Sequence, residues 1–157
     1  MTPCIKILKK LKKKYKLHQY VHESTWSSYG EEAAVKLGVA QEQIFKTLIV
    51  STDKQELAVG IVAVSSKLSL KAMAKLLGAK KVSMADAKDV EKTTGYVLGG
   101  VSPLGQKKKL RTVIDTSAKN YESIFVSAGK RGLEVELSPS DLEELLDTQF
   151  ENIQIED

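Results

Sequence analysis

The stretch Ile44-Phe45-Lys46-Thr47-Leu48-Ile49-Val50 predicts the central strand of this protein. All of its residues except Lys46 are apolar or β-branched, which is the composition of a largely buried strand. Asp53-Lys54 then predicts a turn, and residues 57–64 are rich enough in strand-forming side chains to return as the partner strand. The centre of the fold is therefore predicted to be a β-hairpin.

Helices and shorter strands surround this hairpin. Capping residues followed by apolar residues at helical spacing predict helices at 2–15, 30–38, 69–78, 86–93 and from Ser138 onward. Alternating apolar residues predict strands at 17–21, 82–84, 110–115, 123–127 and 133–137, with a last one at Ile153 and Ile155. Because the helices are scattered among hairpins, we expect an α+β fold. In it, a mixed, mainly antiparallel sheet curls towards a barrel with flanking helices.

The composition predicts one globular domain over residues 1–157. Hydrophobic residues make up 42% of the chain and charged residues 28%, which is ordinary for a soluble protein. No apolar run reaches the ~20 residues of a membrane helix, and lysines interrupt the apolar positions near the N-terminus, which excludes a signal-peptide core. The single cysteine, Cys4, has no partner for an internal disulfide, so we expect a cytoplasmic protein.

The formal net charge of +4 is unevenly distributed. Lysines crowd residues 6–16, a second basic cluster follows at residues 107–111, and the last residues, 151–157, are acidic instead. Basic clusters of this kind suit a polyanion such as a nucleic acid, but they also occur as ordinary solvated surfaces.

Lys46 breaks the pattern of its strand. Period-two alternation places it on one face with Ile44, Leu48 and Val50. A lysine among aliphatic side chains is costly to bury unless an anionic partner or ligand accompanies it. The alternative is a lysine that protects an edge strand from aggregation, and both interpretations remain open on the residues alone.

Two glycine-rich segments lie in the second half of the chain. The first is Thr94-Gly95-Tyr96-Val97-Leu98-Gly99-Gly100-Val101-Ser102-Pro103-Leu104-Gly105. It predicts either a tight turn that leaves a buried strand or a rigid wall of backbone N–H donors facing a ligand. The second, Ser127-Ala128-Gly129-Lys130-Arg131-Gly132, predicts a hairpin turn or a place where Lys130 and Arg131 meet a nucleic-acid backbone.

Several familiar catalytic patterns are missing from the sequence. It contains no G-x-S-x-G elbow, no phosphate-binding P-loop and no H-E-x-x-H motif. One cysteine and two histidines argue against a Cys/His zinc site, so no metal or cofactor is expected. His18, Tyr20 and His22 share one face of a predicted strand and either line a pocket or lie idle on the surface. Neither histidine has an evident serine and acid partner for a hydrolase triad.

Four motifs together resemble a known family. Phe45-Lys46-Thr47-Leu48, Thr94-Gly95-Tyr96, residues 99–108 and Gly129-Lys130-Arg131-Gly132 occur in this order. The chain closely resembles the bacterial YbaK family of Cys-tRNA(Pro) deacylases, which are related to the editing domain inserted in bacterial prolyl-tRNA synthetases. The likeness covers nearly the whole chain, from Thr2-Pro3 to the final helix. It implies the fold of that family and a free-standing editing enzyme.

The resemblance also implies roles for individual residues. Lys46 falls on the lysine that the family requires, and Gly99 and Pro103 fall on its Gly-x-x-x-Pro loop. Tyr20 and Thr47 fall on pocket positions. The amides around Gly100, Val101 and Ser102 are expected to bind the oxyanion of the reaction. The remaining residues expected to bind substrate are Ser127, Lys130 and Arg131. Ala128 departs from the glycine expected there, which puts the local geometry of that turn in doubt.

The implied activity is removal of cysteine from mischarged Cys-tRNA(Pro), and also from Cys-tRNA(Cys). A hydrophobic pocket separates ligands that differ by one methylene by only ~10–200-fold, so a second site must remove the error. In this family the substrate thiol is thought to attack its own ester carbonyl, which requires no protein nucleophile. The implied partners are the acceptor end of an aminoacylated tRNA and prolyl-tRNA synthetase. Two alternatives stay open: a water-dependent deacylase for alanine or another small amino acid, and a non-catalytic tRNA- or synthetase-binding module.

Overall fold

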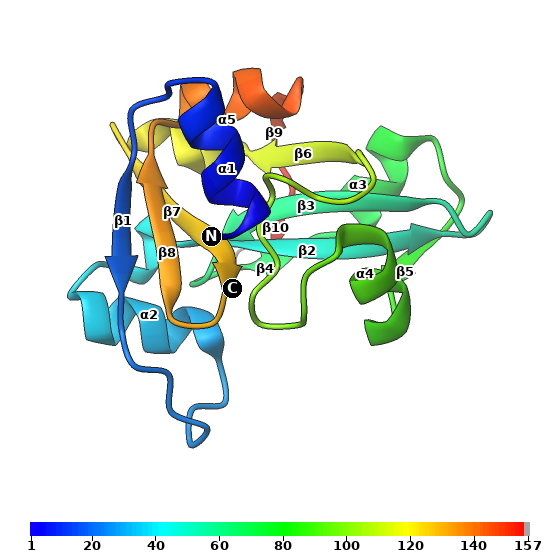
Figure 1. The fold of residues 1–157 in the computed structure, drawn as a ribbon. Helices are drawn as coiled ribbons and strands as arrows, with labels where there is room; N and C mark the ends of the chain where they lie inside the picture. Colours follow the sequence, from blue (N-terminus) through cyan, green and yellow to red (C-terminus); the bar gives the residue numbers. More distant parts are fainter. Residues whose placement is uncertain (156–157) are drawn as a thin grey trace.

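A computed structural model describes residues 1–155 of the chain (Figure 1). The helices are α1 (Pro3–Lys10), α2 (Tyr29–Leu37), α3 (Leu70–Leu77), α4 (Ala87–Thr94) and α5 (Pro139–Leu146), with 3-10 turns at Gln41–Gln43 and Thr116–Asn120. The strands are β1 (Lys16–Gln19), β2 (Phe45–Thr52), β3 (Leu57–Ala63), β4 (Lys67–Leu68), β5 (Val82–Met84), β6 (Arg111–Asp115), β7 (Ile124–Lys130), β8 (Leu133–Leu137), β9 (Gln149–Glu151) and β10 (Gln154–Ile155). Within residues 1–155, no helix is both long and apolar enough to cross a membrane.

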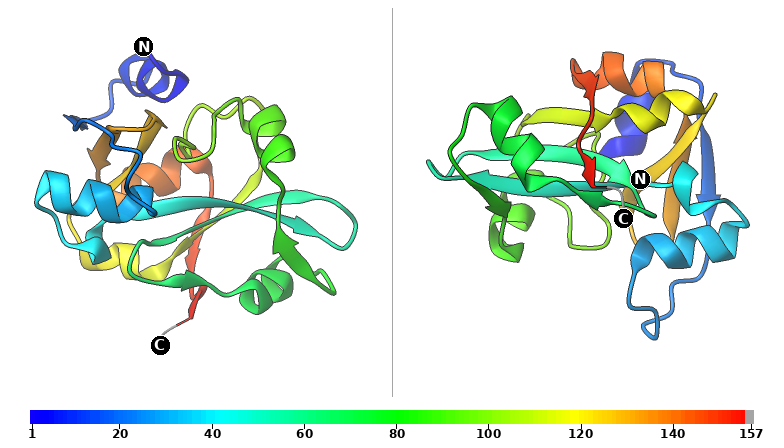
Figure 2. Two further views of the ribbon diagram at one scale, coloured as in Figure 1. Left: turned by 90° about the horizontal axis from the view of Figure 1, so that it is seen from below. Right: turned by 180° about the vertical axis from the view of Figure 1, so that it is seen from behind.

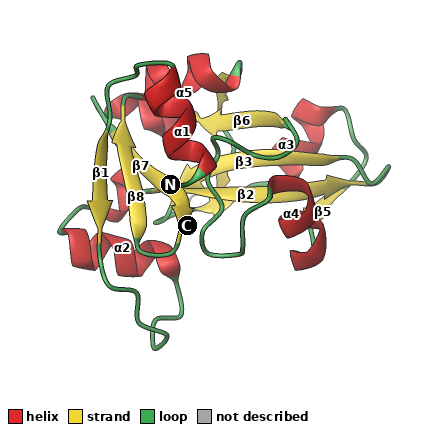
Figure 3. Ribbon diagram, viewed as in Figure 1, coloured by secondary structure: helices red, strands yellow, loops and turns green. Residues whose placement is uncertain are grey.

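The largest sheet has five strands in the order β5-β2-β3-β6-β9 (Figure 3). The predicted hairpin of β2 and β3 lies at its centre, with Lys46 opposite Val62. β5 joins β2 antiparallel, whereas β6 and β9 add in parallel to β3 and β6. A three-stranded antiparallel sheet, β1-β8-β7, stands beside it, and β10 pairs with β4.

The predicted α+β fold with mainly antiparallel strands is confirmed. Over the described residues the strands form three sheets and do not close into a barrel. A short turn of two residues, 131–132, connects β7 to β8, and α2 crosses below the three-stranded sheet in the view of Figure 1. Figure 1 shows the two larger sheets standing at an angle to each other.

Local capping signals place most of the helices where the sequence predicts them. The Ser69 and Ser138 side chains accept hydrogen bonds from the amides at the third helical positions of α3 and α5. The first helix is the exception, because it ends at Lys10 and not near Tyr15. Lys12 adopts φ of 53°, and the Lys13 amide donates to the Leu8 carbonyl, which is the hydrogen bond of a Schellman helix end.

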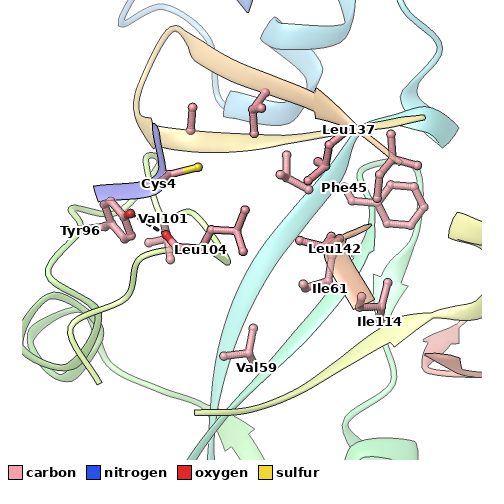
Figure 4. Close-up of a cluster of buried hydrophobic side chains, with 14 of the residues drawn as sticks. Cys4, Phe45, Val59, Ile61, Tyr96, Val101, Leu104, Ile114, Leu137 and Leu142 are labelled. Carbon is pink, nitrogen blue, oxygen red and sulfur yellow. Dashed lines mark hydrogen bonds between the residues drawn. The ribbon is translucent and has the colours of Figure 1, made fainter. Parts of the chain in front are cut away.

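The main hydrophobic core lies between the two larger sheets (Figure 4). Phe45 and Ile61 reach it from β2 and β3, and Leu137 reaches it from β8. Residues 95–105, which follow α4 and which we call the glycine loop, also enter this core through Val101 and Leu104. A second cluster fills the other face of the large sheet under α3 (Figure 2). The core thus fixes the glycine loop against the centre of the molecule.

Candidate active site

A cavity of about 310 Å³ opens where four distant segments meet. Its walls come from β2, from the beginning of α2, from the glycine loop and from the β7–β8 hairpin. In Figure 1 the glycine loop lies beside the edge of β2 that faces away from β3, and Figure 2 shows the same from behind. The cavity therefore depends on contacts between segments that are far apart in the sequence.

Most of the residues singled out from the sequence line this cavity. They are Tyr20, Lys46, Thr47, Gly99, Val101, Ser127 and Lys130. Gly100, Ser102, Pro103 and Arg131 are placed next to it but do not form its lining. The structure thus brings residues of three of the four motifs to one cavity, whereas the fourth, Thr94-Gly95-Tyr96, contributes none to its lining.

Lys46 and Thr47 enter the cavity from β2. Lys46 is half-buried, and this burial lowers the pKa of its ammonium group; Glu31 opposes the shift and Lys67 adds to it. The hydroxyl oxygen of Thr47 is buried and has no hydrogen-bond partner among the residues that the structure describes. The two side chains point to opposite faces of β2, and each offers a polar group that a ligand can satisfy.

The glycine loop approaches its neighbours too closely for side chains. Gly99 has φ of 85°, and a Cβ atom there would lie 2.5 Å from the Tyr29 ring. A Cβ on Gly100 would lie 2.8 Å from the backbone of Lys130. The Gly100 amide donates to the Val97 carbonyl at 3.0 Å, so this amide is already used within the loop. Glycine is therefore needed at both positions for the loop to form the cavity wall.

Ser102 and Pro103 support the loop from outside the cavity. Ser102 is fully buried, and its hydroxyl accepts a hydrogen bond from the Leu104 amide at 3.2 Å. Pro103 lies in a separate hollow against Ile7 and Leu11. The Tyr96 hydroxyl donates to the Leu104 carbonyl at 2.6 Å (Figure 4). These contacts position the loop and do not face a ligand in the cavity.

Arg131 connects three of the cavity walls. Its Nε and Nη2 atoms donate to the Leu98 carbonyl at 3.1 and 2.7 Å. The guanidinium group also lies 4.8 Å from the centre of the Tyr29 ring, in a cation–π contact. Arg131 thus ties the β7–β8 turn to the glycine loop and to the beginning of α2.

Glu134 lines the cavity and was not identified from the sequence. It lies opposite Ser127 in the β7–β8 pair and is 8% exposed. Burial raises the pKa of its carboxyl group to about 8. Burial also raises the pKa of the neighbouring Tyr20 to about 12, and the charge of Glu134 adds to this shift. The sequence carries only a weak signal for it, because Glu134 and Glu136 alternate with apolar residues as on a solvent-exposed strand face.

The histidines and the cysteine lie outside the lining of the cavity. His18 contacts Glu136 at 2.9 Å, and His22 contacts Glu32 at 2.6 Å. Cys4 is buried, and burial raises the pKa of its thiol to about 11. The imidazole and thiol groups, which can serve as base or nucleophile in acyl transfer, are therefore held elsewhere in the fold.

Comparisons with known proteins show the family of this chain. A family model described as "Aminoacyl-tRNA editing domain" matches residues 23–145. An Enterococcus faecalis protein named "Putative Cys-tRNA(Pro)/Cys-tRNA(Cys) deacylase EbsC" is 38% identical over 152 residues, which cover 97% of this chain and 92% of that protein. A proline–tRNA ligase of Desulforamulus reducens is 32% identical over 101 residues, which cover 64% of this chain and 17% of the ligase.

A solved structure described as "a putative trans-editing enzyme for prolyl tRNA synthetase" shares the fold. It superimposes with a TM-score of 0.83 over 99% of both chains, at 21% sequence identity. The matched family range, residues 23–145, contains Lys46, the glycine loop and Glu134.

Proposed function

Because this chain belongs to the aminoacyl-tRNA editing domain family, we propose that it is a deacylase that removes cysteine from Cys-tRNA(Pro) in the cytoplasm. Cys-tRNA(Cys) is a second substrate in this proposal, as the name of the Enterococcus relative suggests. The partners are the acceptor end of the charged tRNA and prolyl-tRNA synthetase. The domain spans residues 1–157.

The observation that carries the proposal is the convergence of Lys46, the glycine loop and Glu134 on one cavity. Its volume of about 310 Å³ suits a small acyl group with part of the nucleoside that carries it. Lys46 provides positive charge and Glu134 provides a carboxyl group. An aminoacyl-tRNA end has matching chemistry, because its phosphates are anionic and its α-amino group is cationic.

Lys46 and Lys130 bind the phosphate or the hydroxyl groups of the terminal adenosine in this proposal. Half-burial strengthens the attraction of Lys46 for an anion, because less water screens the charges. A bound phosphate would in turn raise the pKa of Lys46 again and keep the ammonium group charged. Glu134, on another wall, accepts a hydrogen bond from the α-ammonium group of the amino acid.

The reaction proceeds by attack of the substrate thiolate on its own ester carbonyl carbon. The new carbon–sulfur bond forms while the carbon–oxygen bond to the tRNA ribose breaks, and the proton lost by the thiol ends on the ribose oxygen. The products are a cyclic thiolactone and uncharged tRNA, so no water is consumed. The protein contributes by holding sulfur and carbon in reacting geometry and by donating hydrogen bonds to the oxyanion.

Replacing Lys46 with alanine tests this assignment. Lys46→Ala should abolish deacylation of Cys-tRNA(Pro) with the circular dichroism spectrum unchanged. Lys54→Ala, which removes the same charge from the exposed β2–β3 turn, should leave the rate unaltered. Unimpaired turnover by Lys46→Ala would overturn the site.

A panel of mischarged tRNAs separates the proposed function from its alternatives. Thiol attack predicts that Ser-tRNA(Pro) and Ala-tRNA(Pro) are poor substrates, whereas equal rates would indicate attack by water. If the pure protein deacylates none of them, it is a binding module and not an editing enzyme.

A further inference from the structure

The cavity lies along a sheet edge that no strand covers, and this edge suggests a main-chain binding site. The inference rests on the proposed function. β5 pairs with β2 only at Val50–Thr52, and β7 meets the beginning of β2 through a single bridge between Ile44 and Phe125. Within residues 1–155, no strand pairs with Thr47 on the side opposite β3. An uncovered strand edge presents N–H and C=O groups that can bind another chain or a ligand.

The hydrogen-bond pattern shows which residues point to this edge. The Ile44 carbonyl accepts from Val64 on the β3 side at 2.8 Å, whereas the Ile49 carbonyl accepts from Ala85 on the opposite side at 3.0 Å. In an antiparallel pair the N–H and C=O of one residue point to the same edge, and successive residues alternate between the two edges. Thr47 has the same parity as Ile49, so its N–H and C=O point away from β3.

The cavity lining agrees with this orientation. Five consecutive residues of the chain, 44–48, line the cavity. If a face of the sheet formed the wall, alternate residues would line it, because successive side chains point to opposite faces. A continuous run is the sign of an edge. The cavity wall at β2 is therefore main chain as much as side chain.

The side chain of Thr47 supports the same conclusion. Its hydroxyl oxygen is buried and lacks a hydrogen-bond partner over the described part of the chain. Buried polar groups are almost always paired, so a polar ligand group is expected at this position. The Gly100 amide of the facing loop is already bonded to Val97, so this amide is not free to donate to a ligand.

We propose that the main-chain N–H of Thr47 donates a hydrogen bond to the ester carbonyl oxygen of the bound aminoacyl group. The substrate carbonyl takes the place that a neighbouring strand would occupy beside β2. As the thiolate attacks, negative charge develops on this oxygen, and a fixed N–H donor stabilises it. Removing one such donor typically lowers the rate by ~10²–10³-fold.

Nuclear magnetic resonance on the ¹⁵N-labelled protein tests the contact directly. The probe is 3′-cysteinylamino-3′-deoxyadenosine, in which an amide replaces the reactive ester, and adenosine is the control. The aminoacyl probe should move the Thr47 amide proton downfield and slow its exchange with water, whereas adenosine should not. Shifts confined to the glycine loop would overturn the proposal. If the probe moves no resonance of the cavity, the proposed function itself fails.

A backbone ester at position 47 gives an independent test in the deacylation assay. Incorporating the α-hydroxy analogue of threonine replaces the N–H by an oxygen and keeps the side chain. We expect the rate on Cys-tRNA(Pro) to fall by ~10²–10³-fold. The matched control is an ester at Ile49, on the same edge but outside the cavity lining, and it should retain most of the activity. An unchanged rate at position 47, or equal losses at both positions, would contradict the proposed donor.

Discussion

At the scale of single residues, Gly99 combines a left-handed backbone with a close contact, and a substitution can separate these two features. Gly99 and Gly38 adopt φ of 85° and 67°, but a Cβ on Gly38 meets nothing within 4 Å. Gly38→Ala should therefore cost only the conformational strain, ~1 kcal/mol in the free energy of unfolding. Gly99→Ala should add a collision with the Tyr29 ring and lower kcat/KM for Cys-tRNA(Pro) by about tenfold or more.

Urea unfolding and deacylation rates, measured on both variants, check this expectation. If Gly99→Ala were as active as Gly38→Ala, then the close contact with Tyr29 would not shape the cavity.

Two charged residues in strands show how far the sequence reveals the site. Lys46 stands out because the residues two positions away on either side, Ile44 and Leu48, are aliphatic. Glu134 is hidden by its context, since Glu136 follows two positions later and the pair resembles the solvent face of a strand. The structure buries Glu134 in the middle strand of the three-stranded sheet, opposite His18 of β1 and Ser127 of β7. That burial depends on contacts between distant segments, which a local pattern cannot show.

At the scale of elements, Arg131 is expected to position the glycine loop through its planar guanidinium group. Arg131→Lys keeps the charge but loses both the fork of donors to Leu98 and the stacking on Tyr29. We expect kcat/KM for Cys-tRNA(Pro) to fall by about tenfold, or ~1.4 kcal/mol, in Arg131→Lys as in Arg131→Ala. A double-mutant cycle with Tyr29→Leu should be non-additive, because the two side chains are in contact.

If the lysine variant keeps full activity and only its salt dependence changes, then Arg131 contacts phosphate instead of holding the loop.

Elements with local signals were predicted well, and elements defined by long-range pairing were not. Ser69 with Gly78 bounds α3, and the turn at Asp53 joins β2 to β3, as the sequence indicates. The short strands β4 and β9 escaped prediction, because their few residues form strands only through pairing with β10 and β6. The parallel pairing of β3 with β6 joins segments separated by four other elements, β4, α3, β5 and α4. Such pairings are fixed by the whole core and not by local composition.

At the scale of the whole molecule, two buried carboxyl groups make the free energy of unfolding depend on pH in opposite directions. Burial alone would raise the pKa of Glu32, but hydrogen bonds from Glu23, His22 and Lys36 outweigh it and hold the pKa at about 2. In the unfolded chain the Glu32 carboxyl group has its ordinary pKa of 4.5. The stability that Glu32 contributes is therefore present above pH 4.5 and is lost as the pH falls towards 2.

Glu134 has the reverse effect. The folded protein keeps the Glu134 proton up to about pH 8, whereas the unfolded chain releases it near 4.5. The free energy of unfolding therefore decreases as the pH rises from 4.5 to 8. Each unit of difference between the two pKa values corresponds to ~1.4 kcal/mol, so the total decrease is on the order of a few kcal/mol. The combined contribution of these two groups to stability is therefore largest near pH 4.5.

The neutral variant Glu134→Gln should remove the loss of stability above pH 4.5 and keep the loss of stability below it. Midpoints of urea unfolding, followed by circular dichroism between pH 3 and 9, measure stability on both sides of pH 4.5. A Glu134→Gln protein that still loses stability between pH 4.5 and 8 to the same extent would show that Glu134 is ionised in the cavity. It would then carry its charge at neutral pH without the substrate. In that case the α-ammonium group would find a carboxylate already formed.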